Sequence, residues 1–251
     1  MSKYFLDLLT LKTEMNYRGY SEATKKSYTQ IVGNFLEITD KEIINITKED
    51  VVRYLDENMK LLKKNSRAVH LNALEFFFEE VLGLDITVSI KNYKREFLEK
   101  TFMTLEQFNI LSNSVTEKER LIYEIIKETG FKIKDIVNLK VEDIVYGDKS
   151  YIGIHKVSKE LSRDIQKYCD KEMIDGKIFN VCEYSIRRWN KKATEKYLGA
   201  EYQISDIRRA LALELYIKRG DEEGAVKYLG LKTVEAVRQY YNRTGNKYYK
   251  K

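Results

Sequence analysis

Apolar residues recur at the spacing of an amphipathic helix through the first third of the chain. The first such stretch stops at Gly19, and Ser21 opens the second as an N-cap. Thr47 opens the third, with Asp50 at the third helical position, and Gly83 ends the fourth. The pattern therefore predicts four helices, packed as a compact bundle, in a domain of residues 1–84. The apolar positions of these helices are Phe5, Leu8, Leu9, Leu11, Tyr28, Ile31, Val32, Phe35, Val51, Val52, Tyr54, Leu55, Val69, Leu71, Leu74, Phe76, Phe77, Phe78 and Val81.

The regular spacing is lost over residues 85–101, which carry several charges and few core-sized residues, so we interpret this segment as a linker. Thr104 and Gln107 then form a second capping signal at the start of a new helix. A longer apolar helix ends at Gly130, and a short one follows around residues 133–139. The second domain is therefore expected to begin at residue 102.

Alternating, β-branched residues follow a turn at Gly147 and Asp148, which predicts a small antiparallel sheet within residues 144–165. The second domain, residues 102–251, is thus predicted to be α+β, in a chain that is mainly α. Its remaining helices are expected at 184–198, 205–219, 221–228 and 233–241.

Composition narrows the class of protein. The chain has 251 residues, of which 43% are hydrophobic, and this is enough apolar content for a packed core. No apolar run approaches the roughly 18 residues of a membrane span, and the N-terminus lacks the pattern of a secretory signal. Two cysteines, Cys169 and Cys182, cannot build a disulfide framework and are read as thiols of a reduced cytosol. We therefore expect a cytoplasmic protein with no membrane partner.

The supply of reactive side chains excludes several kinds of chemistry. The two histidines, His70 and His155, lie far apart in the sequence, and with two isolated cysteines they form no metal-ligand motif. No phosphate-binding loop and no dinucleotide-binding glycine motif is present. We expect neither metal nor cofactor, so any catalysis must use Lys, Arg, Tyr or carboxylate side chains.

Charge is distributed unevenly along the chain. Residues 1–100 hold 16 basic and 16 acidic residues, so the whole net charge of +6 belongs to residues 101–251. From Ile207 to the end there are 11 basic and 5 acidic residues. This distribution favours a polyanionic partner for the C-terminal part.

Three short stretches carry the more specific signal: Gly130–Leu139, Ile204–Ala212, and Tyr228–Leu231 followed by Tyr240 and Tyr241. In order and spacing they resemble the tyrosine recombinase (phage integrase) family, in which a tyrosine follows the third motif by nine residues, as Tyr240 follows Leu231. Residues 19–28 and 46–51 resemble the family's helical, SAM-like core-binding domain. The resemblance thus covers nearly the whole chain and implies the tyrosine-recombinase fold for residues 102–251.

The resemblance implies metal-independent DNA strand breaking and rejoining through a 3′-phosphotyrosyl intermediate. Tyr240 is the expected nucleophile, with Tyr241 as its competitor. Arg208 and Lys132 would hold the phosphate oxygens, because fixed cations stabilise the charge of the transition state. A lysine of the predicted hairpin would protonate the leaving oxygen, and Lys156 is favoured for this role over Lys159.

The chain also departs from the family pattern, which predicts a degenerate active site. Lys132 stands where the family has an arginine, so one charge is kept but the two-pronged grip on phosphate is lost. Ser205, Arg209 and Leu231 stand where the family has histidines; we expect Ser205 and Arg209 to contact DNA. Three functions therefore stay open. The first is site-specific recombination or integration of a mobile element. The second is a relaxase-like nickase at a plasmid transfer origin, and the third is a catalytically inactive DNA-binding relative.

The N-terminal domain carries cations that could line a DNA groove. The resemblance implies double-stranded DNA as the partner and leaves room for a homo-oligomer on DNA and for an accessory DNA-binding protein. The N-terminal residues expected to contact DNA are Lys25, Lys26, Lys63, Lys64 and Arg67.

Overall fold

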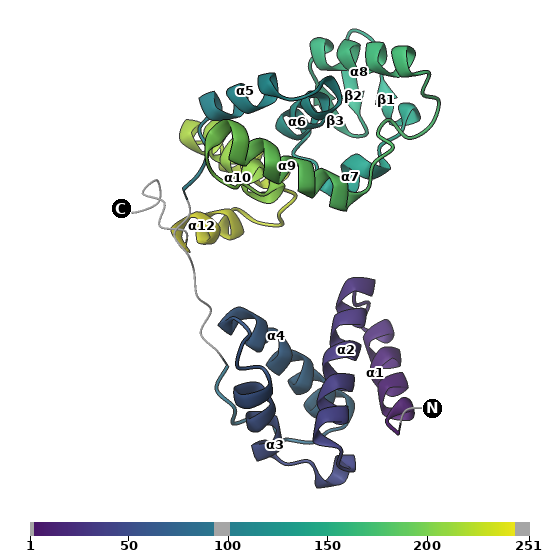
Figure 1. Cartoon of the computed structure of the whole chain (residues 1–251), viewed down its shortest axis with the longest axis vertical. Helices are drawn as coiled ribbons and strands as arrows, with labels where there is room; N and C mark the ends of the chain where they lie inside the picture. Colours follow the sequence, from purple (N-terminus) through teal and green to yellow (C-terminus); the bar gives the residue numbers. More distant parts are fainter. Residues whose placement is uncertain (1–2, 93–100, 244–251) are drawn as a thin grey trace. The chain divides into compact units, whose positions relative to one another are not determined.

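The computed structural model describes residues 3–92 and 101–243, which belong to two compact units with the limits Met1–Phe97 and Leu98–Lys251 (Figure 1). Part of the predicted linker belongs to the first unit, because Ile86 and Ile90 pack against its core. Residues 93–100 of that linker lie outside the described residues. Within the described residues, no helix combines the length and apolar character needed to cross a membrane.

The first unit contains the four helices that the periodicity predicts. Ser21 caps α2 by accepting a hydrogen bond from the Thr24 N–H at 3.2 Å, and the Thr47 N–H donates to Asp50 at the start of α3. Helices α3 and α4 each pass directly into a wider, π-helical turn. The helices are α1 (Phe5–Tyr17), α2 (Glu22–Thr39), α3 (Lys48–Arg53) and α4 (Lys64–Glu75), and the π-helical turns are Tyr54–Asn58 and Phe76–Val81.

Aromatic residues fill the core of this unit. Phe35 of α2 meets Phe78 edge to face, with ring centroids 5.8 Å apart, and it also contacts Tyr54. The prediction that Val69 lies on the buried side of its helix is wrong, since this residue is 43% exposed. The reason is that Val69 lines a surface hollow together with Asn34 and Ser66, so solvent reaches its side chain.

The second unit is a helical domain with a small sheet at one side (Figure 1). Helix α6 packs against α5, α8, α10 and strand β3. The elements are α5 (Leu105–Ser114), α6 (Glu117–Thr129), α7 (Ile133–Asn138), β1 (Ile144–Val145), β2 (Ser150–Ile152), β3 (His155–Val157), α8 (Lys159–Glu172), α9 (Glu183–Leu198), α10 (Ile204–Leu215), α11 (Glu222–Leu229) and α12 (Val234–Arg243), with short 3-10 turns at Ile43–Asn45 in the first unit and at Val141–Asp143 and Ile217–Arg219 in the second.

The sheet is antiparallel in the order β1-β2-β3, as predicted, but it ends at Val157 and not near residue 165. The sequence prediction missed helix α8, which begins at once after the sheet. Ser158 caps this helix by accepting a hydrogen bond from the Leu161 N–H at 3.1 Å. Leu161 and Ile165 are buried one turn apart, so the helix has an apolar face that the β-like run before it obscured.

Helix α12 reaches the rest of the second unit through a small apolar cluster. Val237 and Tyr241 are fully buried and lie with Leu213 of α10 and with Ile217. This packing fixes the last described helix, which carries both candidate tyrosines, against the helix that carries Arg208.

Candidate active site

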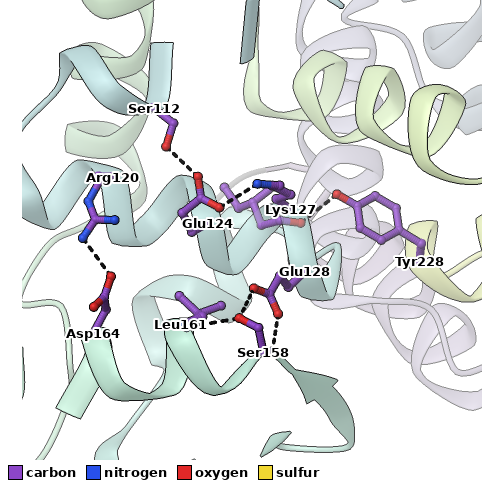
Figure 2. Close-up of polar contacts among 10 residues, drawn as sticks. Ser112, Arg120, Glu124, Lys127, Glu128, Ser158, Leu161, Asp164 and Tyr228 are labelled. Carbon is purple, nitrogen blue, oxygen red and sulfur yellow. Dashed lines mark hydrogen bonds and ion pairs between the residues drawn. The ribbon is translucent and has the colours of Figure 1, made fainter. Parts of the chain in front are cut away.

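The three sequence motifs meet at Gly130, which ends α6 in a left-handed conformation with φ of 70°. A Cβ atom at this position would lie 2.0 Å from the carbonyl oxygen of Tyr228. Tyr228 in turn donates its hydroxyl hydrogen to the Ile126 carbonyl at 2.7 Å, a contact visible in Figure 2. Glycine is therefore required here both by its φ angle and by the close approach of the third motif.

Arg208 joins the second motif to the other two. Its Nε donates to the Gly130 carbonyl at 2.6 Å, and its Nη2 donates to the Leu229 carbonyl at 3.2 Å. Burial lowers the pKa of the Arg208 guanidinium, which nevertheless stays charged at neutral pH. Within the described residues, Arg208 has no carboxylate at ion-pair distance. A buried cation ordinarily has an anionic partner, so this side chain is suited to bind an anion from outside the chain.

The two adjacent tyrosines of α12 have different surroundings. Tyr241 is fully buried, and its hydroxyl donates to the backbone carbonyl of Arg209 at 2.6 Å. The Tyr240 ring lies under the Arg209 guanidinium, with 4.3 Å between Cζ and the ring centroid, and Phe102 lies at its edge. Tyr241 thus anchors α12 to α10, while Tyr240 stands beside the cations of α10.

Lys132 and Lys156 are exposed and lie on adjoining segments. Lys132 precedes α7, where its backbone N–H donates to Asp135 at 2.8 Å, and Lys156 is in the middle of β3. Their chain neighbours Phe131 and His155 stack edge to face at 5.1 Å. Neither ammonium group has an ion pair or hydrogen bond with the part of the chain that the structure describes, so both are available to an external anion.

The structure also gives the surroundings of the remaining candidate residues. Lys159 is the first residue of α8 and pairs with Asp148 at 3.1 Å, which favours Lys156 as the strand lysine facing a ligand. Ser205 is half-buried in the first turn of α10, and Leu231 is half-exposed after the left-handed Gly230. Arg209 pairs with Asp206 at 3.7 Å.

Sequence comparison supports one family for both units. Residues 8–88 match the family model described as "Phage integrase, N-terminal SAM-like domain". Over 225 residues the chain is 27% identical to the tyrosine recombinase XerC of Staphylococcus aureus (strain JH9), an alignment covering 80% of this chain and 73% of that protein. The chain is thus similar to proteins of the tyrosine recombinase (phage integrase) family.

Solved structures of recombinases share the fold of this chain. The lambda integrase tetramer bound to a Holliday junction matches with a TM-score of 0.74 at 17% identity, over 96% of this chain and 77% of that one. The XerH site-specific recombinase bound to its difH substrate, in a pre-cleavage complex, matches with a TM-score of 0.69 at 15% identity, over 93% and 81%. The predicted combination of a SAM-like domain and a catalytic-type domain with a small sheet is confirmed.

The N-terminal cations of this chain differ in their surroundings. Lys25 donates to Asn16 at 2.6 Å and pairs with Glu22, and Arg67 donates to the Lys60 carbonyl at 2.6 Å. The side chains of Lys26, and of Lys63 and Lys64 at the start of α4, are exposed. A DNA-contact role for all five residues stays a prediction.

The sequence analysis missed one basic surface of this chain. Helix α9 presents Arg188, Lys192 and Lys196 to solvent at intervals of four residues, while Ile186 and Ala193 of the same helix are buried. The signal was present in the sequence as basic residues at helical spacing, opposite an apolar face. Next to it, Arg187 and Lys191 line a surface hollow that reaches Ile204, the first residue of α10.

Metal-binding side chains do not gather anywhere in residues 3–92 and 101–243: no group of three or more His, Cys, Asp or Glu residues is arranged to hold an ion. The site that the structure assembles is instead made of one buried arginine, a second arginine against a tyrosine ring, and two exposed lysines. Such a set of cations and donors fits a phosphodiester group.

Proposed function

We propose that this chain breaks and rejoins DNA strands through Tyr240 in site-specific recombination or integration of a mobile element. The observation that carries the proposal is Arg208. It is a buried cation held by two backbone carbonyls, with no carboxylate at ion-pair distance in the described residues and with the nucleophile candidate on the helix packed beside it. A DNA phosphate would supply the missing anion.

The step that this arrangement would perform balances without a metal. The Tyr240 oxygen forms a bond to phosphorus, and its phenolic proton passes to solvent. The bond between phosphorus and the 5′-oxygen breaks, and that oxygen takes a proton from the Lys156 ammonium. The products are a 3′-phosphotyrosyl bond and a free 5′-hydroxyl, so the bond energy is kept for rejoining. Arg208 and Lys132 stabilise the charge that develops on the two non-bridging oxygens.

The substituted positions predict slower chemistry. Lys132 offers a single point charge where the family has a planar, two-pronged arginine, and Leu231 offers no donor. Removing one such donor slows related reactions about 10²- to 10³-fold. Ser205 and Arg209, on the first turns of α10, would contact the DNA backbone at this end of the site.

DNA recognition would also involve the first unit. A surface hollow between α2 and α4 is lined by uncharged hydrogen-bonding side chains, among them Gln30, Asn34 and Ser66, together with the partly exposed Val69. Amide and hydroxyl groups of this kind recognise base edges, and an aliphatic group contacts the thymine methyl. The exposed Lys26 lies close to this hollow in sequence and would hold the phosphates that fix its register.

The oligomeric states of similar proteins on DNA are the basis of the assembly that we propose. The solved lambda integrase structures are a dimer on a core site and a tetramer on a Holliday junction. We infer a homo-oligomer on double-stranded DNA for this chain as well, with an accessory DNA-binding protein as a further partner and the cytoplasm as its location.

The test begins with DNA selected by the protein itself. A duplex library with a randomised central segment is enriched for molecules that the chain binds, and nicked suicide versions of the selected duplex are incubated with the chain. A denaturing gel should show a covalent protein–DNA adduct with the wild-type chain and with Tyr241→Phe. The adduct should be absent with Tyr240→Phe.

The other outcomes separate the remaining functions. Retarded migration on a native gel without any adduct would refute the catalytic proposal and leave a DNA-binding relative. Loss of the adduct in Tyr241→Phe alone, in a variant that still folds, would move the nucleophile by one residue. Cleavage of one strand, without exchange between two duplexes, would replace recombination by nicking.

A further inference from the structure

A carboxylate outside the sequence motifs joins α6 to the end of the sheet. Glu128, in the last turn of α6, accepts two hydrogen bonds from Ser158: one from the backbone N–H and one from the hydroxyl, both at 2.6 Å (Figure 2). Each carboxylate oxygen takes one of them. Ser158 is the residue directly after β3 and is also the N-cap of α8.

The two ends of this contact each lead to a proposed catalytic group. On the α6 side, Gly130 lies two residues after Glu128 and presents its carbonyl to Arg208. On the sheet side, Lys156 lies two residues before Ser158. The contact therefore fixes the distance between the segment that holds the phosphate-binding arginine and the strand that carries the lysine.

A second contact joins the same two segments, the end of α6 and strand β3. The rings of Phe131 and His155 stack at 5.1 Å, one on each side of the gap between the α6–α7 segment and β3. β3 is also held by its pairing with β2 and by the buried Val157. The two hydrogen bonds to one carboxylate add a contact between α6 and the end of β3 whose distance and direction are both fixed.

We propose that Glu128 is a positioning residue of the proposed reaction: its two bonds to Ser158 hold β3 so that the Lys156 ammonium lies at the leaving 5′-oxygen of the phosphate bound by Arg208. The inference rests on the proposed function. It predicts that a Glu128 variant is impaired in one step only, the protonation of the leaving group.

The same helix offers a matched control. Glu124 lies one turn earlier on α6 and is also half-buried with two hydrogen-bond partners, Ser112 at 2.7 Å and Lys127 at 3.0 Å (Figure 2). These partners belong to α5 and to α6 itself, so these two hydrogen bonds do not reach β3. Glu124→Ala removes a comparable network from the same helix without touching the strand that carries the lysine.

The experiment compares two leaving groups on the selected suicide duplex, after the cleaved position has been mapped with the wild-type chain. One duplex has the natural 5′-oxygen at that phosphate, and the other has sulfur in its place. A thiolate leaves without a proton, because a thiol has a pKa of about 8.5 and is far more acidic than an alcohol. Rates of adduct formation are measured for both duplexes.

Loss of a general acid slows such reactions about 10²- to 10⁴-fold. Lys156→Ala should therefore be slowed by about this factor on the oxygen duplex and restored close to the wild-type rate on the sulfur duplex. Glu128→Ala should show the same restoration with a smaller defect, of about tenfold or more. Glu128→Gln should recover part of the rate, because an amide keeps one acceptor for the Ser158 N–H. Glu124→Ala should show no difference between the two duplexes.

The inference is overturned if Glu128→Ala slows both duplexes equally, or slows neither, or if the sulfur duplex fails to restore Lys156→Ala. Ser158→Ala, which keeps the backbone bond, is the second variant if Glu128→Ala does not fold, and it should show the same restoration. Absence of any adduct between the wild-type chain and either duplex would refute the proposed function instead, and this result is distinct from all of these.

Discussion

The close approach of Gly130 to Tyr228 allows a quantitative test of how the site is held together. We consider Gly130→Ala. The added methyl group is strained at φ of 70°, and a left-handed conformation costs a residue with a side chain about 1–2 kcal/mol. It would also lie 2.0 Å from the Tyr228 carbonyl oxygen, so one of the two backbones must move by more than an ångström.

That displacement reaches Arg208, because its two acceptors are the carbonyls of Gly130 and of Leu229, the residue after Tyr228. A hydrogen bond to a charged group contributes about 1.5–3 kcal/mol. Loss of one such bond together with the φ strain gives about 2.5–5 kcal/mol of destabilisation. The matched control is Gly199→Ala: its φ is 68° and its Cβ would meet no atom within 4 Å, so strain alone applies, about 1–2 kcal/mol.

The assay is urea unfolding followed by tryptophan fluorescence. The chain has one tryptophan, Trp189, which lies on α9 against Tyr123 and so reports on the second unit. We expect Gly130→Ala to lose about 1.5–3 kcal/mol more than Gly199→Ala, the share assigned to the lost bond. Equal losses in the two variants would refute the argument that the close approach, and not the φ angle alone, requires glycine at 130.

Three further outcomes follow from the contacts. Tyr241→Phe removes the hydrogen bond to the Arg209 carbonyl, so the second unit should lose about 1–3 kcal/mol in urea unfolding while the covalent adduct still forms; an abolished adduct in folded protein contradicts this. Burial lowers the pKa of His70 below 6.5, so its contribution to stability is complete above pH 6.5 and lost as the pH falls below it. Circular dichroism melts of His70→Asn should therefore decline less between pH 7 and 5 than those of wild type, and parallel declines would disprove the assignment. Lys26→Gln should lower the salt dependence of DNA binding by about one charge, whereas Lys25→Gln, whose ammonium already has internal partners, should change it little; equal effects would count against the assignment.

Local physics determined much of the secondary structure from the sequence alone. The capping groups Ser21 and Thr104 and the left-handed Gly130 act within a few residues of themselves, so their positions in the sequence were sufficient to place helix ends. Helix α8 was missed because its cap, Ser158, directly follows a strand of three residues, and the alternating pattern of the strand was extended too far. The order and spacing of the motifs also indicated a resemblance to the tyrosine recombinases, and the compared sequences show the same similarity.

The tertiary structure alone decided how the site is assembled. The acceptors of Arg208 are 78 and 21 residues away in the chain, and Ser158 is 30 residues from Glu128. Periodicity carries no information about such pairs, because it reports only which side of an element is apolar. Motif spacing favoured Tyr240 over Tyr241 as the nucleophile, but it could not show what surrounds either residue. Adjacent residues of a helix point about 100° apart, so the Tyr241 hydroxyl reaches the Arg209 carbonyl while the Tyr240 ring meets the Arg209 guanidinium.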